Sequence, residues 1–202
     1  MTRAGKAEKK VLLLLAQGFE ELEASVFTDV MGWSRVAGET AVGVTACGLR
    51  RRIECTWNFT VLPERLVHEV SVRDYDALAI PGGYEEAHFY EDAFHEDFLA
   101  LIRDFHTAGK WIAAVCVGAL PVAKSGVLRD RPATTYGLLG GIRRRQLAEL
   151  GARVQDRPLV EDGRVITCAG PAQALDTAFL LLERLSSAEN VLKVKTAMGF
   201  GG

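Results

Sequence analysis

Short, continuous apolar runs alternate along the chain with segments in which apolar residues recur every three or four positions. The runs at residues 11–16, 76–80 and 111–115 have the length expected of strands that are covered on both faces. A further strand is predicted at residues 41–46. Strands of this kind are typical of parallel sheets with helices on both sides.

Helices are predicted between these strands. Over residues 22–37 and 94–105 the apolar side chains share one helical face, and Gly38 and Gly109 follow the two segments. Another helix is predicted at residues 175–185. Strands that alternate with helices of this length predict a layered α/β domain with a mainly parallel sheet.

Two segments depart from this alternation. Residues 50–75 open with a pattern that favours an antiparallel excursion, and the stretch at 62–70 fits either a short helix or a loop. Residues 159–167 are predicted to form a hairpin, with its turn at Asp162 and Gly163.

The chain shows no internal repeat, low-complexity tract or linker. A single domain is therefore expected over residues 11–197, between a polar, basic tail at 1–10 and a C-terminal tail at 198–202.

Composition narrows the class of protein. The 202 residues are 49% hydrophobic and 25% charged, with a net charge of −2, which is ordinary for a globular protein. This balance gives no attraction to nucleic acid or to anionic membranes, and the apolar run at residues 11–16 is too short to span a bilayer. A small-molecule partner is expected.

The four cysteines lie far apart in the sequence and form no Cys-x-x-Cys pair. The spacing therefore predicts neither a zinc ribbon nor a thioredoxin-type redox couple. Reduced thiols in the cytoplasm are expected, with no metal and no organic cofactor. Cys47, Cys55 and Cys168 are interpreted as packing residues. Because Cys168 follows a strand, a second redox thiol near the same sheet edge is the alternative for this residue.

Three strand ends carry residues that suit chemistry, and ligands of open α/β sheets bind beyond such ends. They are Gly18–Glu23, Pro81–Gly83 and Ala114–Gly118. The third resembles a nucleophile elbow with cysteine in place of serine, because small residues stand two before and two after Cys116. An inert, buried cysteine is the alternative.

The elbow also predicts how the thiol is activated. A helix start after Cys116 would favour the thiolate, and the amide of Val117 would point at an oxyanion. Glu20 and Glu21 fit a simpler role as first-turn carboxylates, which the helix dipole favours. Glu23 lies further into the helix, where desolvation would keep it protonated beside the sulfur.

The set of motifs VLLLLAQGFEELEA, DALAIPGGYEEAHF, WIAAVCVGALPVAKSGVL and VITCAGPAQALDTAFLLLERL resembles the ThiJ/PfpI superfamily, nearest the branch that contains the parkinsonism-associated deglycase. The resemblance runs from about residue 11 to residue 185. It implies a flavodoxin-like three-layer α/β sandwich, of the class I glutamine amidotransferase-like type, and a homodimer.

Carried over residue by residue, the resemblance makes Cys116 the nucleophile and Glu23 the carboxyl group that hydrogen-bonds to it. Gly83 and Val117 match the oxyanion-hole amides, and Gly82 accompanies them. Two departures from the family matter.

Val117 stands where the protease-like branch has histidine, so a Cys-His peptidase is not expected. Tyr136 lies in the segment where many deglycase-branch members carry a histidine. A tyrosine is a poor base at neutral pH but donates a hydrogen bond to a substrate oxygen. His88 is a second candidate at the pocket mouth, with an exposed loop histidine as the alternative. The basic residues 143–145 are interpreted as a solvated helix face, with an anion site as the alternative.

Three functions stay open at this point. The first is cofactor-free glyoxalase- or deglycase-like chemistry on reactive dicarbonyls, in which the Cys116 thiolate attacks and Glu23 moves protons. The second is an oxidative-stress sensor or chaperone-like protein with an oxidisable Cys116 and little turnover. The third is an isonitrile hydratase-like enzyme, which would use the same thiolate in a different pocket.

Overall fold

The computed structural model describes residues 8–200, and its main sheet has seven strands in the spatial order β10-β11-β7-β6-β1-β2-β5. In chain order these strands are β1 Lys9–Leu15, β2 Val42–Gly48, β5 Arg65–Leu66, β6 Ala77–Ile80, β7 Trp111–Val115, β10 Leu159–Asp162 and β11 Val165–Cys168. Only β10 runs antiparallel to its neighbour, through the predicted hairpin with β11.

The five central strands β2, β1, β6, β7 and β11 are all parallel. Numbered along the chain, their spatial order is 2-1-3-4-5, which is the flavodoxin-like arrangement. The order reverses between β1 and β6, and ligands of such sheets bind beyond the strand ends at this reversal. The predicted fold class is confirmed, and the topology points to the edge that carries residues 18–23 and 81–83.

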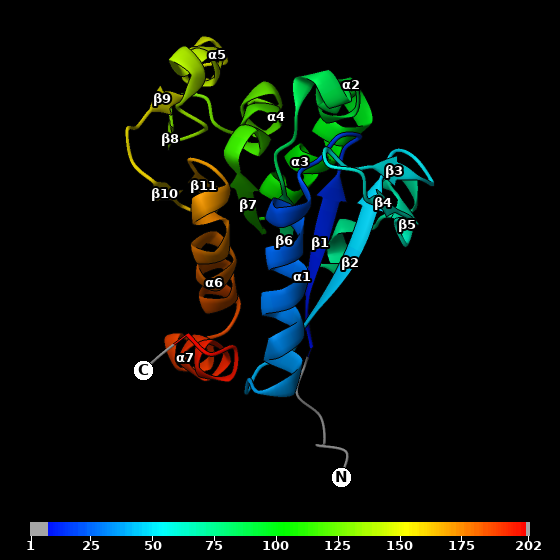
Figure 1. Cartoon of the computed structure of the whole chain (residues 1–202), viewed down its shortest axis with the longest axis vertical. Coiled ribbons are helices and arrows are strands. Elements are labelled where there is room, and N and C mark those ends of the chain that lie inside the picture. Colours follow the sequence, from blue (N-terminus) through cyan, green and yellow to red (C-terminus); the bar gives the residue numbers. More distant parts are fainter. Residues whose placement is uncertain (1–7, 201–202) are drawn as a thin grey trace.

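Helices cover both faces of this sheet (Figure 1). The α-helices are α1 Glu21–Val36, α2 Phe89–Ala93, α3 Glu96–Thr107, α4 Ala119–Lys124, α5 Ile142–Glu149, α6 Ala174–Leu185 and α7 Ala188–Ala197. Helices α1, α6 and α7 pack together on one face, and α3 and α4 contact the other. The result is three layers.

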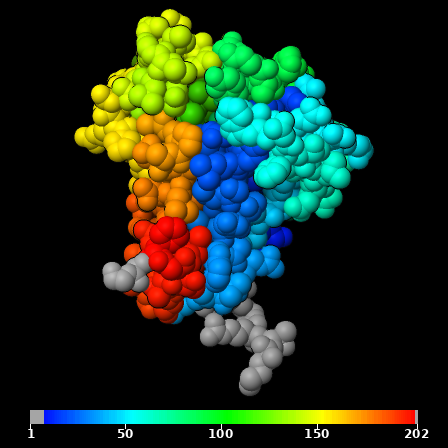
Figure 2. All heavy atoms as spheres, viewed as in Figure 1, coloured from blue at the N-terminus to red at the C-terminus, as the bar shows by residue number. Residues whose placement is uncertain are grey.

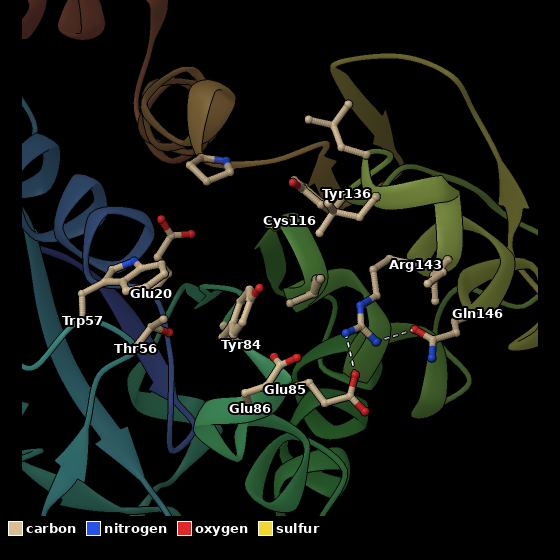
Figure 3. Close-up of a pocket in the computed structure, with 16 residues that line it drawn as sticks. Glu20, Thr56, Trp57, Tyr84, Glu85, Glu86, Cys116, Tyr136, Arg143 and Gln146 are labelled. Carbon is tan, nitrogen blue, oxygen red and sulfur yellow. Dashed lines mark hydrogen bonds and ion pairs between the residues drawn. The ribbon is translucent and has the colours of Figure 1, made fainter.

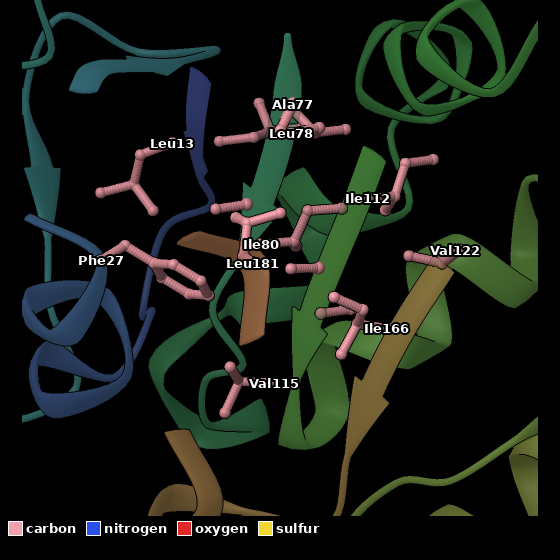
Figure 4. Packing of buried hydrophobic residues seen from close by; sticks show 14 of the residues in the cluster. Leu13, Phe27, Ala77, Leu78, Ile80, Ile112, Val115, Val122, Ile166 and Leu181 are labelled. Atoms are coloured by element: carbon pink, nitrogen blue, oxygen red, sulfur yellow. The ribbon is translucent and has the colours of Figure 1, made fainter. Parts of the chain in front are cut away.

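The core lies on both sides of the central strands (Figure 4). Leu12 and Leu14 of β1 and Ile112 of β7 have no solvent exposure, and Phe27 of α1 is equally buried. Burial of each such side chain contributes about 1.5–3 kcal/mol to folding. This burial explains why the strands read as continuous apolar runs rather than as alternating patterns.

The helix predicted at residues 94–105 begins later than expected. Helix α2 ends at Ala93, and Phe94 stacks on Tyr90 with ring centroids 4.8 Å apart. His95 then caps α3, because its Nδ1 accepts a hydrogen bond from the Asp97 amide at 3.3 Å. Because an N-cap residue begins a new helix, α2 and α3 are separate helices. The spacing of apolar residues continues across the break between them and therefore does not reveal it.

The excursion predicted in residues 50–75 is an antiparallel pair of short strands, β3 Ile53–Glu54 and β4 Thr60–Val61. The following stretch is neither a helix nor a plain loop, since it forms β5 and then the 3-10 turns Val67–Glu69 and Val72–Asp74. A second small sheet pairs β8 Pro132–Ala133 with β9 Arg153–Val154.

Helix α7 was not predicted, because few of its residues are apolar and buried. It packs beside α1 (Figure 2, red against blue), and its Asn190 is almost fully buried. The Asn190 Oδ1 atom accepts hydrogen bonds from the amides of Glu39 at 2.5 Å and Thr40 at 3.1 Å. A helix that is held in place by a buried polar side chain cannot be predicted from the spacing of apolar residues.

The structured part of the chain extends beyond the boundaries expected from sequence. Strand β1 begins at Lys9, whose Nζ atom lies 3.0 Å from Asp76 Oδ1. At the other end Phe200 packs edge-on against Phe179, with centroids 5.7 Å apart. The rest of the two predicted tails, residues 1–7 and 201–202, lies outside the described residues. Within residues 8–200, no helix combines the length and the apolar character needed to cross a bilayer.

Candidate active site

Cys116 occupies a strained turn between β7 and α4. Its backbone φ angle is 55°, a left-handed conformation that costs a non-glycine residue about 1–3 kcal/mol. A 3-10 turn, Cys116–Gly118, connects it to α4, so the predicted helix start is tighter than a regular α-helix. A Cβ atom on Gly118 would lie 2.7 Å from the Ile80 carbonyl oxygen, which explains the small residue there.

Glu23 approaches Cys116 from the first turn of α1. Its side chain has no solvent exposure, and its Oε2 atom accepts a hydrogen bond from the Gly82 amide at 2.6 Å. A Cβ atom on Gly82 would lie 2.8 Å from this Oε2, 3.0 Å from the Val117 nitrogen and 3.1 Å from the Cys116 Cβ. Only glycine therefore lets the strand ends of β6 and β7 meet at this carboxyl group.

Burial raises the pKa of Glu23 well above its usual range, and the nearby Glu20 carboxylate adds to the shift. The hydrogen bond from Gly82 opposes it without reversing it. The expectation that desolvation keeps Glu23 protonated beside the sulfur is in line with this direction.

The pKa of the Cys116 thiol is also raised, against the expectation of a favoured thiolate. Burial is the main cause and the charge of Glu23 the next, and together they outweigh the opposing hydrogen bond from the Val117 amide. A 3-10 turn followed by a six-residue helix supplies too little positive potential to compensate for desolvation. At neutral pH the Cys116 thiol thus holds its proton.

The raised pKa of Cys116 predicts how the rate of its alkylation depends on pH. Only the thiolate reacts, and a pKa above the ordinary value of about 8.5 keeps the thiolate scarce at neutral pH. The rate of labelling by iodoacetamide, followed by peptide mass spectrometry, is expected to keep rising with pH beyond the midpoint of free glutathione measured in parallel. A rate that levels off below pH 7 would contradict the raised pKa.

Two backbone amides belong to the part of the cavity lining that includes Cys116. Gly83 lines the cavity in front of Cys116, and its N–H forms no hydrogen bond with any described residue. The Val117 amide points at the sulfur, where it opposes the rise in pKa. A Cβ atom on Gly83 would lie 2.3 Å from the Gly18 carbonyl oxygen and from the Phe89 ring, so this amide can be placed here only by glycine. Both amides suit an oxyanion.

Cys116 opens into a cavity of about 470 Å³ (Figure 3). One side of the cavity is formed by the β3–β4 turn and by the segment after β6. The start of α5 forms the other side. Its lining residues are Glu20, Thr56, Trp57, Gly83, Tyr84, Glu85, Glu86, Cys116, Val117, Tyr136, Leu138, Leu139, Ile142, Arg143, Gln146 and Pro171. Tyr136 is among them, whereas Glu23 and Gly82 are not, although Gly82 packs directly against Cys116.

His88, which the sequence suggests near the pocket mouth, is not among the residues that line this cavity. Its backbone adopts a left-handed conformation that ends the 3-10 turn Glu85–Ala87, and its Nδ1 atom lies 2.9 Å from Glu91 Oε1. The side chain is two-thirds exposed. The alternative of an exposed loop histidine is the one that the structure supports.

Two charged residues of the cavity were assigned other roles from sequence. Glu20 was interpreted as a first-turn carboxylate, yet it lines the cavity and acts on the pKa of both Glu23 and Cys116. Arg143 was placed on a solvated face, yet it lines the cavity and bonds Glu85 at 2.7 Å. The run of acidic residues after β1 could have signalled Glu20, while nothing in the sequence places α5 over the sheet edge.

Residues 8–200 contain no group of three histidine, cysteine, aspartate or glutamate side chains arranged to hold a metal ion. The chemistry open to the site is that of a buried thiol, a buried carboxyl group of raised pKa and the backbone amides of Gly83 and Val117.

A cysteine at a strained strand-to-helix turn, paired with a buried glutamate at the switch point of a flavodoxin-like sheet, defines a class of protein. The chain belongs to the DJ-1/PfpI family, which it matches over residues 9–184. The expected ThiJ/PfpI membership and its branch are confirmed.

Relatives of the same branch cover nearly the whole chain. The chain is 31% identical to protein dj-1beta of Drosophila melanogaster, over 92% of this chain and 94% of the relative. It is 27% identical to the Parkinson disease protein 7 homolog of Danio rerio, over 95% of this chain and 97% of that protein. The crystal structure of Drosophila melanogaster DJ-1beta superposes with a TM-score of 0.82 at 26% identity, covering 97% of this chain and all of that one.

Proposed function

We propose that the protein is a cofactor-free enzyme of glyoxalase- or deglycase-like type, acting on reactive dicarbonyls through Cys116 and Glu23. The observation that carries this proposal is the contact of three strand ends. The Gly82 amide binds Glu23 at 2.6 Å, and Gly82 packs against Cys116 so closely that no Cβ atom fits. This contact supports assigning Cys116 as the nucleophile and Glu23 as the proton carrier, with Gly83 and Val117 as oxyanion donors.

In the first step the Cys116 sulfur bonds to the aldehyde carbon of a 2-oxoaldehyde. The S–H proton ends on the former aldehyde oxygen, so the product is a neutral hemithioacetal, and the amides of Gly83 and Val117 stabilise the charge that develops on that oxygen. A thiol that holds its proton at rest is compatible with this step, because the proton is consumed in it.

In the second step the acid form of Glu23 gives its proton to the ketone oxygen, and the resulting carboxylate takes the proton from the aldehyde-derived carbon, which leaves an enediol. Glu23 then returns that proton to the former ketone carbon and takes the O–H proton of the former aldehyde oxygen, so it is protonated again at the end. The first carbon is oxidised to a thioester and the second is reduced to an alcohol, so no external oxidant or reductant is needed. Water then cleaves the thioester, and the thiol returns with release of a 2-hydroxy acid. Tyr136 lines the cavity, and its hydroxyl group would donate a hydrogen bond to a substrate oxygen.

The test is an assay of the purified protein with methylglyoxal, without glutathione, metal or cofactor. Lactate is expected to form in proportion to protein concentration, and methylglyoxal is expected to disappear at the same rate. Consumption of methylglyoxal without lactate would indicate simple adduct formation and would refute the isomerisation.

An oxidation-responsive role is the second candidate. Cys116 lines the cavity, whereas the other three cysteines, which are also buried and free, do not. Oxidants that enter the cavity would therefore reach this sulfur first. Selective conversion of Cys116 to the sulfinic acid by mild peroxide, with no lactate formation, would favour this role.

The four free thiols also support a proposed location in the reducing cytoplasm.

We further propose a homodimer that uses the exposed face of α1. Leu22, Trp33 and Val36 are 54%, 38% and 77% exposed. At about 3.6 residues per turn they fall within roughly 60° of one another on the helix. Gly32 lies beside this stripe with open space around its Cα, so it allows a close approach. A stripe of large apolar side chains on one helix favours burial against a second copy.

Replacing Trp33 and Val36 together with glutamate is expected to give a monomer by light scattering, since two like charges would face each other across a symmetric interface. Leu192→Glu is the control, because Leu192 is 64% exposed on α7 and lies outside the stripe. A wild-type monomer at micromolar concentration would refute the proposed interface.

A further inference from the structure

Large apolar side chains are concentrated around the Cys116 cavity. Among residues 8–200, twelve large hydrophobic side chains are exposed, and five of these line this cavity. The five are Trp57, Tyr84, Leu138, Leu139 and Ile142. Exposed apolar surface that converges on one cleft marks a place where a ligand removes it from water.

These side chains form two opposing walls. Trp57 and Tyr84 stack at a tilt of 42°, with ring centroids 6.0 Å apart, and Leu138, Leu139 and Ile142 come from the segment that leads into α5. Figure 3 shows Trp57 and Tyr84 on one side, Arg143 of α5 on the other, and Cys116 between them. A chain or ring bonded to the sulfur would extend between two apolar surfaces.

The leucine wall is held in an unfavourable backbone conformation. Leu139 has a φ angle of 52° and is followed by Gly140 at 73° and Gly141 at 69°. Glycine adopts this region freely, but leucine does not, and the Leu139 side chain is 71% exposed. No burial of that side chain compensates for the strain, which is typical of residues kept for function.

The charges of the cavity disfavour anions. Its lining residues include three glutamates, Glu20, Glu85 and Glu86, and one arginine, Arg143. The Arg143 guanidinium is already bonded to Glu85 at 2.7 Å and to Gln146 at 3.0 Å. A phosphate or carboxylate on the substrate would meet net negative charge without an unpaired cation among the lining residues. The preferred substrate is therefore neutral or cationic.

The cavity is also larger than the smallest dicarbonyl needs. Its volume of about 470 Å³ lies in the range of clefts that enclose drug-sized ligands. Methylglyoxal has only five non-hydrogen atoms, so it would leave both apolar walls in contact with water.

We propose that the cavity selects neutral 2-oxoaldehydes that carry a hydrophobic tail, aliphatic or aromatic, seated between the Trp57–Tyr84 pair and the leucine wall. The proposal rests on the proposed function for the identity of the reacting carbonyl group, but the apolar subsite itself does not depend on turnover. In this arrangement the aldehyde carbon lies at Cys116 and the tail replaces water along the walls.

The first experiment compares kcat/KM for 2-oxoaldehydes with methyl, propyl, pentyl and phenyl substituents. Complete burial would raise kcat/KM about fourfold per methylene, from ~0.8 kcal/mol per buried CH₂. The pentyl compound is expected to exceed methylglyoxal at least tenfold. Equal or falling values along the series would overturn the proposal while leaving the dicarbonyl chemistry intact.

Three variants locate the subsite. Leu138→Asp is expected to abolish the pentyl preference, because it adds a charge to the wall. Leu139→Gly is expected to reduce the preference without lowering Tm, since glycine relieves the left-handed strain, whereas a purely structural leucine would lower Tm when removed. Leu192→Asp changes an equally exposed leucine outside the cavity and should leave the preference unchanged.

A second readout needs no turnover. Cys116 is labelled with N-ethyl-, N-cyclohexyl- and N-phenylmaleimide, and each rate constant is divided by that for glutathione. The cyclohexyl and phenyl reagents are expected to react at least fivefold faster than the ethyl reagent, and Leu138→Asp should remove the difference. If no 2-oxoaldehyde is turned over but this preference is present, the proposed function fails and the subsite stands. A flat maleimide series refutes the subsite.

Discussion

Replacement of Cys116 by serine is expected to reduce lactate formation from methylglyoxal by a factor on the order of 10⁴ or more, the scale of loss for a covalent nucleophile. Serine fills nearly the same volume, but its hydroxyl group is a far weaker nucleophile in a site where no neighbouring group acts as a strong base. Progress curves for lactate in wild type and variant measure the effect.

The other cysteines supply a matched control for this variant. Cys55 and Cys116 are both 7% exposed, but Cys55 lies outside the cavity and burial raises its pKa to about 12. Cys55→Ser should therefore keep wild-type turnover. Retention of activity in Cys116→Ser, or its loss in Cys55→Ser at unchanged Tm, would show that turnover does not depend on the elbow sulfur.

Glu23→Gln is expected to lower kcat by about 10²–10⁴, the range for loss of one general acid–base group. Glutamine keeps the shape of the side chain and can still accept the hydrogen bond from the Gly82 amide. It cannot transfer protons between carbons, so the hemithioacetal should form and then fail to isomerise.

The same substitution should have the opposite effect on thiol reactivity. The charge of Glu23 is one cause of the raised pKa of Cys116. That charge is present only above the pKa of Glu23, in the alkaline range where the thiol titrates, and glutamine never carries it. The midpoint of Cys116 alkylation is therefore expected at lower pH in Glu23→Gln than in wild type, while lactate formation falls. Loss of both alkylation and lactate formation would indicate a damaged site. Retention of wild-type lactate formation would show that Glu23 has no part in the mechanism.

Hydrophobic periodicity predicts most of the fold because the central strands are buried on both faces. The elements that escaped prediction are held by polar contacts. Helix α7 is anchored by the buried Asn190, and α3 begins at the His95 cap. The sequence also places the elbow and the two glycine-rich strand ends at one sheet edge, because topology brings these ends together.

The sequence does not predict the electrostatics or the walls of the cavity. From the sequence, the helix dipole and the Val117 amide are expected to lower the pKa of Cys116. In the structure, burial raises that pKa instead. Neither the exposed position of His88 nor the place of Glu20 in the cavity lining follows from the sequence, since both depend on how loops fold over the sheet edge. The strain at Leu139 is a backbone angle, which the identity of a leucine in the sequence does not reveal.

The most direct measurement is an NMR spectrum of Glu23→Gln mixed with methylglyoxal that carries an isotopic label at its aldehyde carbon. A hemithioacetal resonance that is present in this variant, and absent when Cys116 is also replaced by serine, is the predicted result. Lactate formation by the double variant, or an adduct that maps to another cysteine, would contradict the assignment of Cys116 as the nucleophile.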